Sequence, residues 1–325
     1  MKILVTGGSG FIGSHLCERL LAEGHVVINL DNFNDFYAPE IKWKNIANCL
    51  KNDSFHLVEG DIRDIELTDG IFQKEKIELV IHLAAMAGVR PSLDNPVYYS
   101  SVNINGTQNI LENCRNYGVK RLIFASSSSV YGNNDKVPFS EADSVDHPIS
   151  PYAATKKAGE LLCHTYHHNF EMSIICLRFF TVYGARQRPD LAIHKFTRLL
   201  SEGKELPLFG NGSTSRDYTY IEDIIKGITG AIDFVKNNNI YEVINLGESQ
   251  TITLLEMVKT LENEMRIKGH YKWLPAQPGD MEKTFADISK AKKMLGYVPK
   301  TEFSAGIREF LKWFNNNKMY NSEEL

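Results

Sequence analysis

The N-terminal segment is a short apolar run followed at once by closely spaced glycines. Residues 2–6 have the composition of a buried parallel strand, and Gly7, Gly10 and Gly13 lie in the turn before an apolar run with helical spacing. Glycines at these positions permit a tight turn, a close approach of the backbone to a pyrophosphate, and close packing of helix on strand. Free amides at the helix N-terminus favour an anion there. The pattern therefore predicts a βαβ unit that binds a dinucleotide.

The acidic residue that completes this unit is Asp31. A second apolar run, 25–30, predicts the next strand and ends directly before it. A carboxylate at this place in a dinucleotide-binding unit accepts hydrogen bonds from a ribose diol. Because its negative charge would repel a 2′-phosphate, Asp31 favours NAD over NADP as the cofactor.

The first half of the chain continues to alternate between apolar strands and helices. Strands are predicted over 55–59, 78–83, 121–125 and 173–180, with helical segments between them. Such alternation is typical of a doubly wound parallel sheet with right-handed crossovers. Ligands of these sheets bind beyond the carboxyl ends of the strands. We therefore predict an α/β, Rossmann-like fold with its ligand site at that edge.

Two of these strands end in residues suited to a cofactor site. After the third strand, Asp61 could hydrogen-bond an adenine amino group and Ile62 could pack on the ring. Asp61 or Asp64 could equally cap the next helix, which is compatible with the first role. After the fourth strand, the small residues at 84–85 would let a cofactor pass close to the backbone.

The candidates for proton transfer are Tyr152 and Lys156. They are four residues apart in a predicted helix, 151–169, and so lie on one face of it. A free tyrosine is a poor base near neutral pH, but an adjacent ammonium favours the phenolate. A serine of the run 126–129 could relay the proton. Because this spacing also recurs by chance, its meaning comes from the dinucleotide-binding context.

After residue 181 the composition changes to basic residues and turn formers. Arg186, Arg188 and Arg216 could clamp phosphates, since a guanidinium bonds two oxygens at once, or could be ordinary surface arginines. We expect a smaller α/β substrate domain over 182–325. The cofactor domain would cover 1–181, joined in space by about 219–248.

Composition narrows the class of protein. The formal net charge of −4 gives no indication of a nucleic-acid or anionic-membrane surface. The five dispersed cysteines, with no C-x-x-C pair, fit a reducing compartment. We predict no signal peptide, no membrane span and a cytoplasmic location. The three histidines at 164, 167 and 168 lack a carboxylate or cysteine to complete a coordination set, so we predict no metal.

Taken together, these stretches resemble the extended short-chain dehydrogenase/reductase superfamily, and within it the nucleotide-sugar epimerases. The resemblance runs to about residue 313. It is closest to the UDP-glucuronate 4-epimerases, through TGGSGFIG at 6–13, DNFNDFY at 31–37, HLAAMAGVRPS at 82–92, FASSSSVYG at 124–132, SPYAATKKAGELLCHTYHH at 150–168 and LRFFTVYGARQRPDLAIHKF at 177–196. Ala185 stands where relatives usually carry proline.

The resemblance implies a role for each matching residue. Tyr152 would be the catalytic base, Lys156 its pKa partner and ribose anchor, and Ser127 the proton relay. Residues implied to bind NAD are Gly7, Gly10, Phe11, Ile12, Gly13, Asp31, Asn32, Asp61, Ile62, Leu83, Ala84, Ala85, Asn103, Tyr152, Lys156 and Phe179. Residues implied to bind a UDP-sugar are Arg90, Ser127, Ser128, Thr181, Arg188, Arg216 and Asp280, of which Ser127, Ser128 and Thr181 would hold a sugar carboxylate.

The serine run separates the branches of this family. The 4,6-dehydratases carry an Asp-Glu pair after the relay residue, and the decarboxylases carry a glutamate in the same stretch. Here Ser128 and Ser129 occupy those positions. Hydroxyl groups can bond a uronate carboxylate that an acidic side chain would repel, so the run favours a UDP-glucuronate 4-epimerase with a 4-keto intermediate.

Three other functions remain open from the sequence. The nearest is a 4-epimerase of neutral UDP-sugars, such as UDP-glucose or UDP-N-acetylglucosamine. The next is a keto-sugar reductase that consumes NAD(P)H, and the last is a cofactor-binding regulator without activity. For assembly, the resemblance implies a homodimer formed through helices near 98–117 and 151–169.

Overall fold

The largest feature of the fold is a parallel sheet that is seven strands wide. The structure is a computed structural model that describes residues 1–275 and 282–317. In sheet order the strands are β11 (Tyr241–Leu246), β6 (Ser173–Phe179), β5 (Arg121–Ser127), β4 (Leu79–His82), β1 (Lys2–Thr6), β2 (Val26–Asp31) and β3 (Phe55–Glu59). The strand order reverses between β1 and β4, which is where a ligand crevice forms in such sheets. The predicted α/β fold class is confirmed.

Successive residues of each central strand face opposite layers of helices. In β1, Ile3 and Val5 belong to one buried cluster and Leu4 to the other. The first cluster packs under α1 (Phe11–Ala22), α9 (Ile221–Asn237) and α11 (Ser289–Leu295), with α2 (Pro39–Asn45) and the 3₁₀ turn η1 (Cys49–Lys51) nearby. The second packs under α3 (Ile65–Lys74), α6 (Thr107–Asn116) and α7 (Pro151–Phe170). Burial on both faces explains why these strands are apolar throughout.

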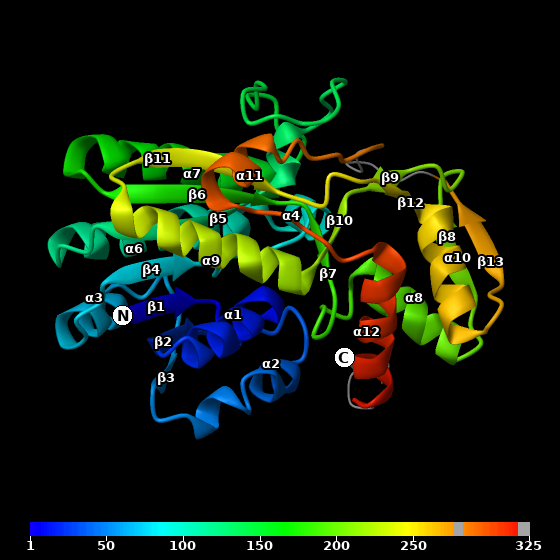
Figure 1. Cartoon of the computed structure of the whole chain (residues 1–325), viewed down its shortest axis with the longest axis horizontal. Coiled ribbons are helices and arrows are strands. Elements are labelled where there is room, and N and C mark those ends of the chain that lie inside the picture. Colours follow the sequence, from blue (N-terminus) through cyan, green and yellow to red (C-terminus); the bar gives the residue numbers. More distant parts are fainter. Residues whose placement is uncertain (276–281, 318–325) are drawn as a thin grey trace.

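A smaller lobe lies beside the sheet, at the right of Figure 1. It has its own apolar core, shared by α8 (Ala192–Ser201), α10 (Leu254–Met265), α12 (Phe303–Asn315) and β8 (Leu206–Phe209). The mostly exposed strand β13 (Tyr271–Leu274) pairs with β8 at its edge. Short pairs connect it to the sheet, namely β7 (Thr181–Tyr183) with β10 (Tyr218–Tyr220) and β9 (Ser215–Arg216) with β12 (Ile252–Thr253).

The helical segment that begins at residue 96 is divided into three. It comprises α5 (Pro96–Ser100), a π-helical turn η2 (Ser101–Gly106) and α6. Within η2, the Asn103 amide accepts from Met86 N at 2.8 Å and donates to Met86 O and Thr155 Oγ1, each at 3.0 Å. These tertiary hydrogen bonds favour the wider turn, and they tie the loop after β4 to α7. The loop after β4 leads into a short helix, α4 (Val89–Asp94).

Candidate active site

A cavity of about 250 Å³ opens at the carboxyl edge of the sheet. Residues that follow β1, β2, β3 and β4 line it, as do the ends of β5 and β6 and the start of α7. Of the sequence-predicted cofactor residues, the lining includes Gly7, Gly10, Phe11, Ile12, Gly13, Asp31, Asn32, Asp61, Ile62, Leu83, Ala84, Ala85, Tyr152, Lys156 and Phe179. Segments far apart in the chain therefore meet at one site.

The three glycines of the first turn are required for different reasons. Gly7 has φ +73°, and a Cβ there would lie 2.8 Å from Ala84 N. A Cβ on Gly13 would lie 2.2 Å from Gly7 O, so the packing of α1 on the turn excludes any side chain. At Gly10 the nearest atom to an added Cβ, Gly7 O, is 3.4 Å away. No protein atom therefore excludes a side chain at Gly10, but this residue borders the cavity, where a side chain would take up ligand space.

The acidic residues of the cavity are held by backbone and side-chain donors. Asp31 accepts from Ser9 N at 3.0 Å and from Phe33 N at 2.9 Å, while burial raises the pKa of its carboxyl group. Asp61 accepts from Arg63 and, at 2.9 Å, from Asn32 Nδ2. Burial opposes ionisation of Asp61, but these donors hold its pKa below the usual value.

The first turn of α3 decides between the two capping residues proposed from the sequence. Asp64 is the N-cap, because its Oδ1 accepts from Leu67 N at 3.0 Å. Asp61 instead accepts from Arg63 N at 2.8 Å and forms an ion pair with the same arginine. The Arg63 guanidinium lies 5.1 Å from the centre of the Tyr98 ring. The Asp61 carboxylate is therefore fixed in the wall of the cavity by its own neighbours.

The helix α7 brings Tyr152 and Lys156 to the cavity. It begins at Pro151, and the Ser150 side chain caps it by accepting from Ala153 N at 3.2 Å. The Lys156 ammonium donates to Ala125 O at 2.7 Å and lies 5.9 Å from the centre of the Tyr152 ring. Both side chains line the cavity, as the i, i+4 spacing indicates.

Burial shapes the electrostatics of this pair. It raises the pKa of Tyr152, and the Ser127 hydroxyl, through a hydrogen bond, and the Arg188 guanidinium, through its charge, oppose that rise. Burial also lowers the pKa of Lys156 to about 8, a value at which the ammonium form still predominates near neutral pH. The role of Lys156 in favouring the phenolate stays a prediction.

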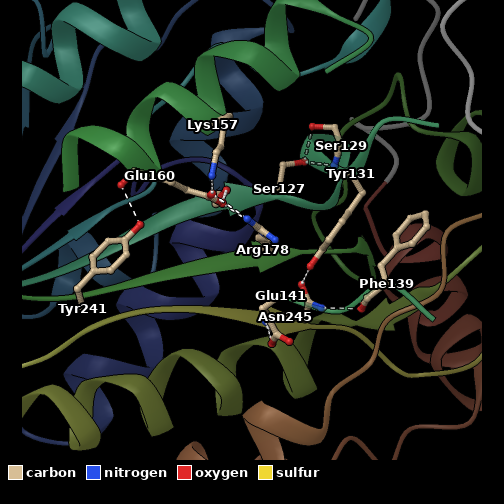
Figure 2. A network of polar contacts seen from close by, with 11 residues as sticks. Ser127, Ser129, Tyr131, Phe139, Glu141, Lys157, Glu160, Arg178, Tyr241 and Asn245 are labelled. Atoms are coloured by element: carbon tan, nitrogen blue, oxygen red, sulfur yellow. Dashed lines mark hydrogen bonds and ion pairs between the residues drawn. The ribbon is translucent and has the colours of Figure 1, made fainter. Parts of the chain in front are cut away.

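The serine run turns away from β5 as a 3₁₀ helix, η3 (Ser128–Tyr131). Ser129 donates to Ser127 Oγ from its backbone N at 3.2 Å and from its hydroxyl at 3.0 Å (Figure 2). Ser127 Oγ therefore has its own hydrogen left to donate, a property suited to a relay. Ser126 bonds elsewhere, to Glu160 Oε1 at 2.6 Å.

Behind the serines lies a buried ion pair, shown in Figure 2. Arg178 donates from Nε and Nη2 to the two carboxylate oxygens of Glu160, at 2.8 and 2.9 Å, and the side chains are 2% and 0% exposed. The guanidinium lies 4.8 Å from the centre of the Tyr131 ring, whose hydroxyl donates to Asn245 Oδ1 at 2.7 Å. Because Glu160 is one turn after Lys156, the network fixes α7 against β5, β6 and β11.

Of the residues implied to bind a UDP-sugar, Arg188 lines the cavity. Its guanidinium donates to both carboxylate oxygens of Asp190, at 2.9 Å each, and lies 5.2 Å from the centre of the Phe36 ring. Arg186 instead forms an ion pair with Glu18 of α1 at 2.7 Å, which holds the loop that contains Arg186 against α1.

The other predicted residues stand around the cavity rather than in its lining. Arg90 lies 5.2 Å from the centre of the Phe209 ring in the smaller lobe, and Arg216 donates to Ser215 O at 2.9 Å. Within the described residues, the cavity lining does not include Arg90, Asn103, Ser127, Ser128, Thr181 or Arg216. Asn103 lies behind the cavity wall, where it hydrogen-bonds Met86, a lining residue, and Thr155 of α7. Asp280 lies outside the described residues.

The cavity also contains side chains that the sequence interpretation did not single out. They come from the segment after β2 and from helix α5, and they include Asn34, Phe36, Tyr37, Lys42 and Tyr98. Asn34 Nδ2 donates to Tyr98 Oη at 3.1 Å and so closes one side of the cavity. The signal in the sequence was the polar and aromatic stretch 31–37, which is unusual directly after a buried strand.

Two features are absent from the described ranges, 1–275 and 282–317. No cluster of three or more His, Cys, Asp or Glu side chains with the geometry of a metal site occurs there. None of the helices in those ranges combines the length and apolarity needed to cross a bilayer.

Comparisons with known proteins give the family. A family model described as GDP-mannose 4,6 dehydratase matches residues 4–310. The chain belongs to this family of extended short-chain dehydrogenases/reductases. The family resemblance predicted from the motifs is thereby confirmed. The family model takes its description from a dehydratase, whereas the relatives described next are epimerases.

Three relatives in the family show how close the likeness is. UDP-glucuronate 4-epimerase 4 of Arabidopsis thaliana is 42% identical over 97% of this chain and 75% of its own length. The crystal structure of a Bacillus cereus UDP-glucuronic acid 4-epimerase with UDP-glucuronic acid and NAD is 40% identical, covers 97% of this chain and 99% of its own, and has a TM-score of 0.91. A Thermotoga maritima UDP-glucose 4-epimerase with UDP-glucose is 33% identical over 98% and 99%, with a TM-score of 0.89.

Proposed function

We propose that the protein is a UDP-glucuronate 4-epimerase, which interconverts UDP-glucuronate and UDP-galacturonate through a 4-keto intermediate. The observation that carries the proposal is the serine run beside Tyr152. Hydroxyl groups stand at 128 and 129, where the dehydratase and decarboxylase branches would carry acids. The likeness to epimerases of UDP-glucuronate in Arabidopsis thaliana and Bacillus cereus supports the same assignment.

NAD is the cofactor that the cavity fits. Gly10 leaves open space at the N-terminus of α1, where free amides favour a pyrophosphate. Asp31 presents a carboxylate for a ribose diol, and its charge disfavours a 2′-phosphate. The Bacillus cereus relative was crystallised with NAD. When bound, NAD supplies the reversible hydride acceptor that a 4-epimerase requires.

The side chains of this protein would supply proton transfer and orientation. The Tyr152 phenolate takes the proton of the sugar 4-hydroxyl, helped by the Ser127 hydroxyl and the Arg188 guanidinium, which both favour its ionised form. Lys156, held by Ala125 O, would anchor the nicotinamide ribose. Once the keto sugar has turned and the hydride has returned to the other face of C4, the same tyrosine would give the proton back to the 4-oxygen.

The site must fix the orientation of the sugar carboxylate as well as bind it. The 4-keto intermediate is a β-keto acid, which loses carbon dioxide when the carboxylate bond aligns with the ketone. We assign Ser127, Ser128 and Thr181 to the carboxylate, and Arg90, Arg188, Arg216 and Asp280 to the sugar diphosphate part. Hydroxyl donors on neighbouring segments, at the end of β5 and the start of β7, would fix the carboxylate away from that alignment.

A second candidate is a 4-epimerase of neutral UDP-sugars, favoured by the likeness to the Thermotoga maritima UDP-glucose 4-epimerase. An NMR time course with UDP-glucuronate and no added reductant separates the two. We expect signals of UDP-galacturonate without UDP-pentose and without net NADH. Turnover of UDP-glucose or UDP-N-acetylglucosamine, with none of UDP-glucuronate, would refute the uronate assignment and leave the epimerase chemistry in place.

We also propose a cytoplasmic homodimer with two domains. The free, buried cysteines suit a reducing compartment. Strand β11 and helix α9 pack on the large sheet, which supports a cofactor domain of 1–181 with about 219–248. The rest of 182–325 would form the substrate domain, although its helix α11 also packs on the large sheet.

The proposed dimer forms through α5, α6 and α7, which pack together and expose Val97 (80%) and Leu161 (57%). Apolar side chains this exposed, on adjoining helices, are suited to an interface. Light scattering at micromolar concentration should give twice the 36.8 kDa chain mass, and a monomeric mass would contradict the proposal.

A further inference from the structure

Lys42 is a buried lysine on the wall of the cavity. It lies on the short helix α2, the residue is 6% exposed, and it borders the same cavity as the glycine turn. Asn45, three residues later on the same helix, donates from Nδ2 to Ser9 O at 3.1 Å. Because residues three apart share a helix face, this bond holds the Lys42 side of α2 against the turn.

The contacts of the Lys42 ammonium are poor for a buried cation. Its Nζ donates to Asn34 O at 2.6 Å and lies 4.9 Å from the centre of the Tyr37 ring. Burial and the like charge of Arg188 lower the pKa of Lys42, and Asp31 acts in the other direction. Within the described residues, Lys42 forms no ion pair within 4.0 Å. An ammonium so placed is costly unless the cavity receives an anion.

Two further features of the cavity indicate that the anion bound beside Lys42 is a phosphate. The N-terminus of α1 lines the same cavity with Phe11, Ile12 and Gly13, and free backbone amides there favour a phosphate. Arg188 adds a second cation close enough to Lys42 to affect its ionisation. A lysine is well suited to phosphate as a compact point charge with three donors.

We propose that Lys42 binds the pyrophosphate of the dinucleotide and neutralises part of its charge. The proposal rests on the dinucleotide site of the proposed function, and it adds an anchor that the glycine motif does not supply. The buried Lys42 ammonium would thus hold the cofactor by its charge attraction to the pyrophosphate. The competing roles are a contact to ribose hydroxyls and a purely structural tie between α2 and the loop at Asn34.

The test compares Lys42→Met with Lys44→Met in the full-length protein. Lys44 is on the same helix, two residues away and exposed, so it is a matched control. Calorimetric titration with ADP and with adenosine, on protein freed of nucleotide, isolates the phosphate contribution. We expect Lys42→Met to bind ADP roughly 10- to 100-fold more weakly, with adenosine unchanged and Lys44→Met like wild type. Lys42→Arg should keep most of the ADP affinity.

The stability of the variants separates binding from folding. Without nucleotide, Lys42→Met should melt at or above the wild-type temperature, because a buried charge has been removed. A fall in melting temperature would favour the structural tie and overturn the proposal. Equal losses for ADP and adenosine would assign Lys42 to the ribose instead, and equal ADP affinity in the two methionine variants would also overturn it. If wild-type protein binds neither ADP nor NAD, the cofactor assignment itself fails.

Discussion

Replacing Tyr152 with phenylalanine should lower kcat for epimerisation by roughly 10²- to 10⁴-fold, the usual contribution of a positioned acid–base group. The ring remains to pack in the cavity, so the NAD content and the melting temperature should stay near those of wild type. Tyr117→Phe is the control, since that hydroxyl bonds Asp69 on the surface at 2.9 Å, away from the cavity. Substantial turnover by Tyr152→Phe in the NMR assay would remove the tyrosine from the mechanism.

The pH dependence gives this prediction a second readout. Because burial raises the pKa of Tyr152 and the base form is the deprotonated one, kcat of the wild type should increase with pH on the acidic side of its optimum. The residual activity of Tyr152→Phe should lack that limb. A rising limb that survives in Tyr152→Phe would assign the titration to another group.

Replacing Glu160 with glutamine should lower the free energy of unfolding by about 3–5 kcal/mol, since it leaves the buried Arg178 without its counter-ion. Urea unfolding measures the loss. Lys157→Gln is the matched control, because Lys157 Nζ lies 3.4 Å from the same carboxylate but is partly exposed, and such pairs contribute about 1 kcal/mol or less. A double variant with methionine at 160 and 178 should recover much of the loss.

The pH dependence of this pair has a defined sign. Burial opposes ionisation of Glu160, but the donors of Arg178 lower its pKa below the usual value. The stability that the pair contributes is therefore present above the unfolded pKa of a glutamate, about 4.3, and is lost as the pH falls through the lower folded value. If Glu160→Gln is no less stable than Lys157→Gln, the pair does not fix α7.

Much of this arrangement follows from local sequence patterns. The strand β3 has the predicted bounds, because an apolar run bounded by polar or turn residues leaves few alternatives. The glycine turn and the i, i+4 pair Tyr152 and Lys156 are set by backbone geometry, which a sequence displays directly. These local features were therefore sufficient to predict which residues line the cavity from the glycine turn and from the first turns of α7.

What could not be predicted depends on contacts between distant segments. The π-helical turn at 101–106 contains Asn103, which bonds both Met86 and Thr155. Lys42 belongs to no motif, and it borders the cavity on a helix that Asn45 ties to the glycine turn. The partner of Arg186 is Glu18, more than half the chain away. Helical periodicity and composition contain no information on such pairings.

The position of β11 in the sheet has a consequence for how the chain is made. All seven residues of β6 are buried, yet their outer neighbour β11 follows only after most of the smaller lobe. During synthesis, one edge of β6 therefore stays unpaired until residues 241–246 have left the ribosome. The large sheet can therefore be completed only after most of the smaller lobe has been synthesised. A truncation after residue 181 would leave the outer edge of β6 unpaired and prone to pair with other chains, instead of giving an independent cofactor domain.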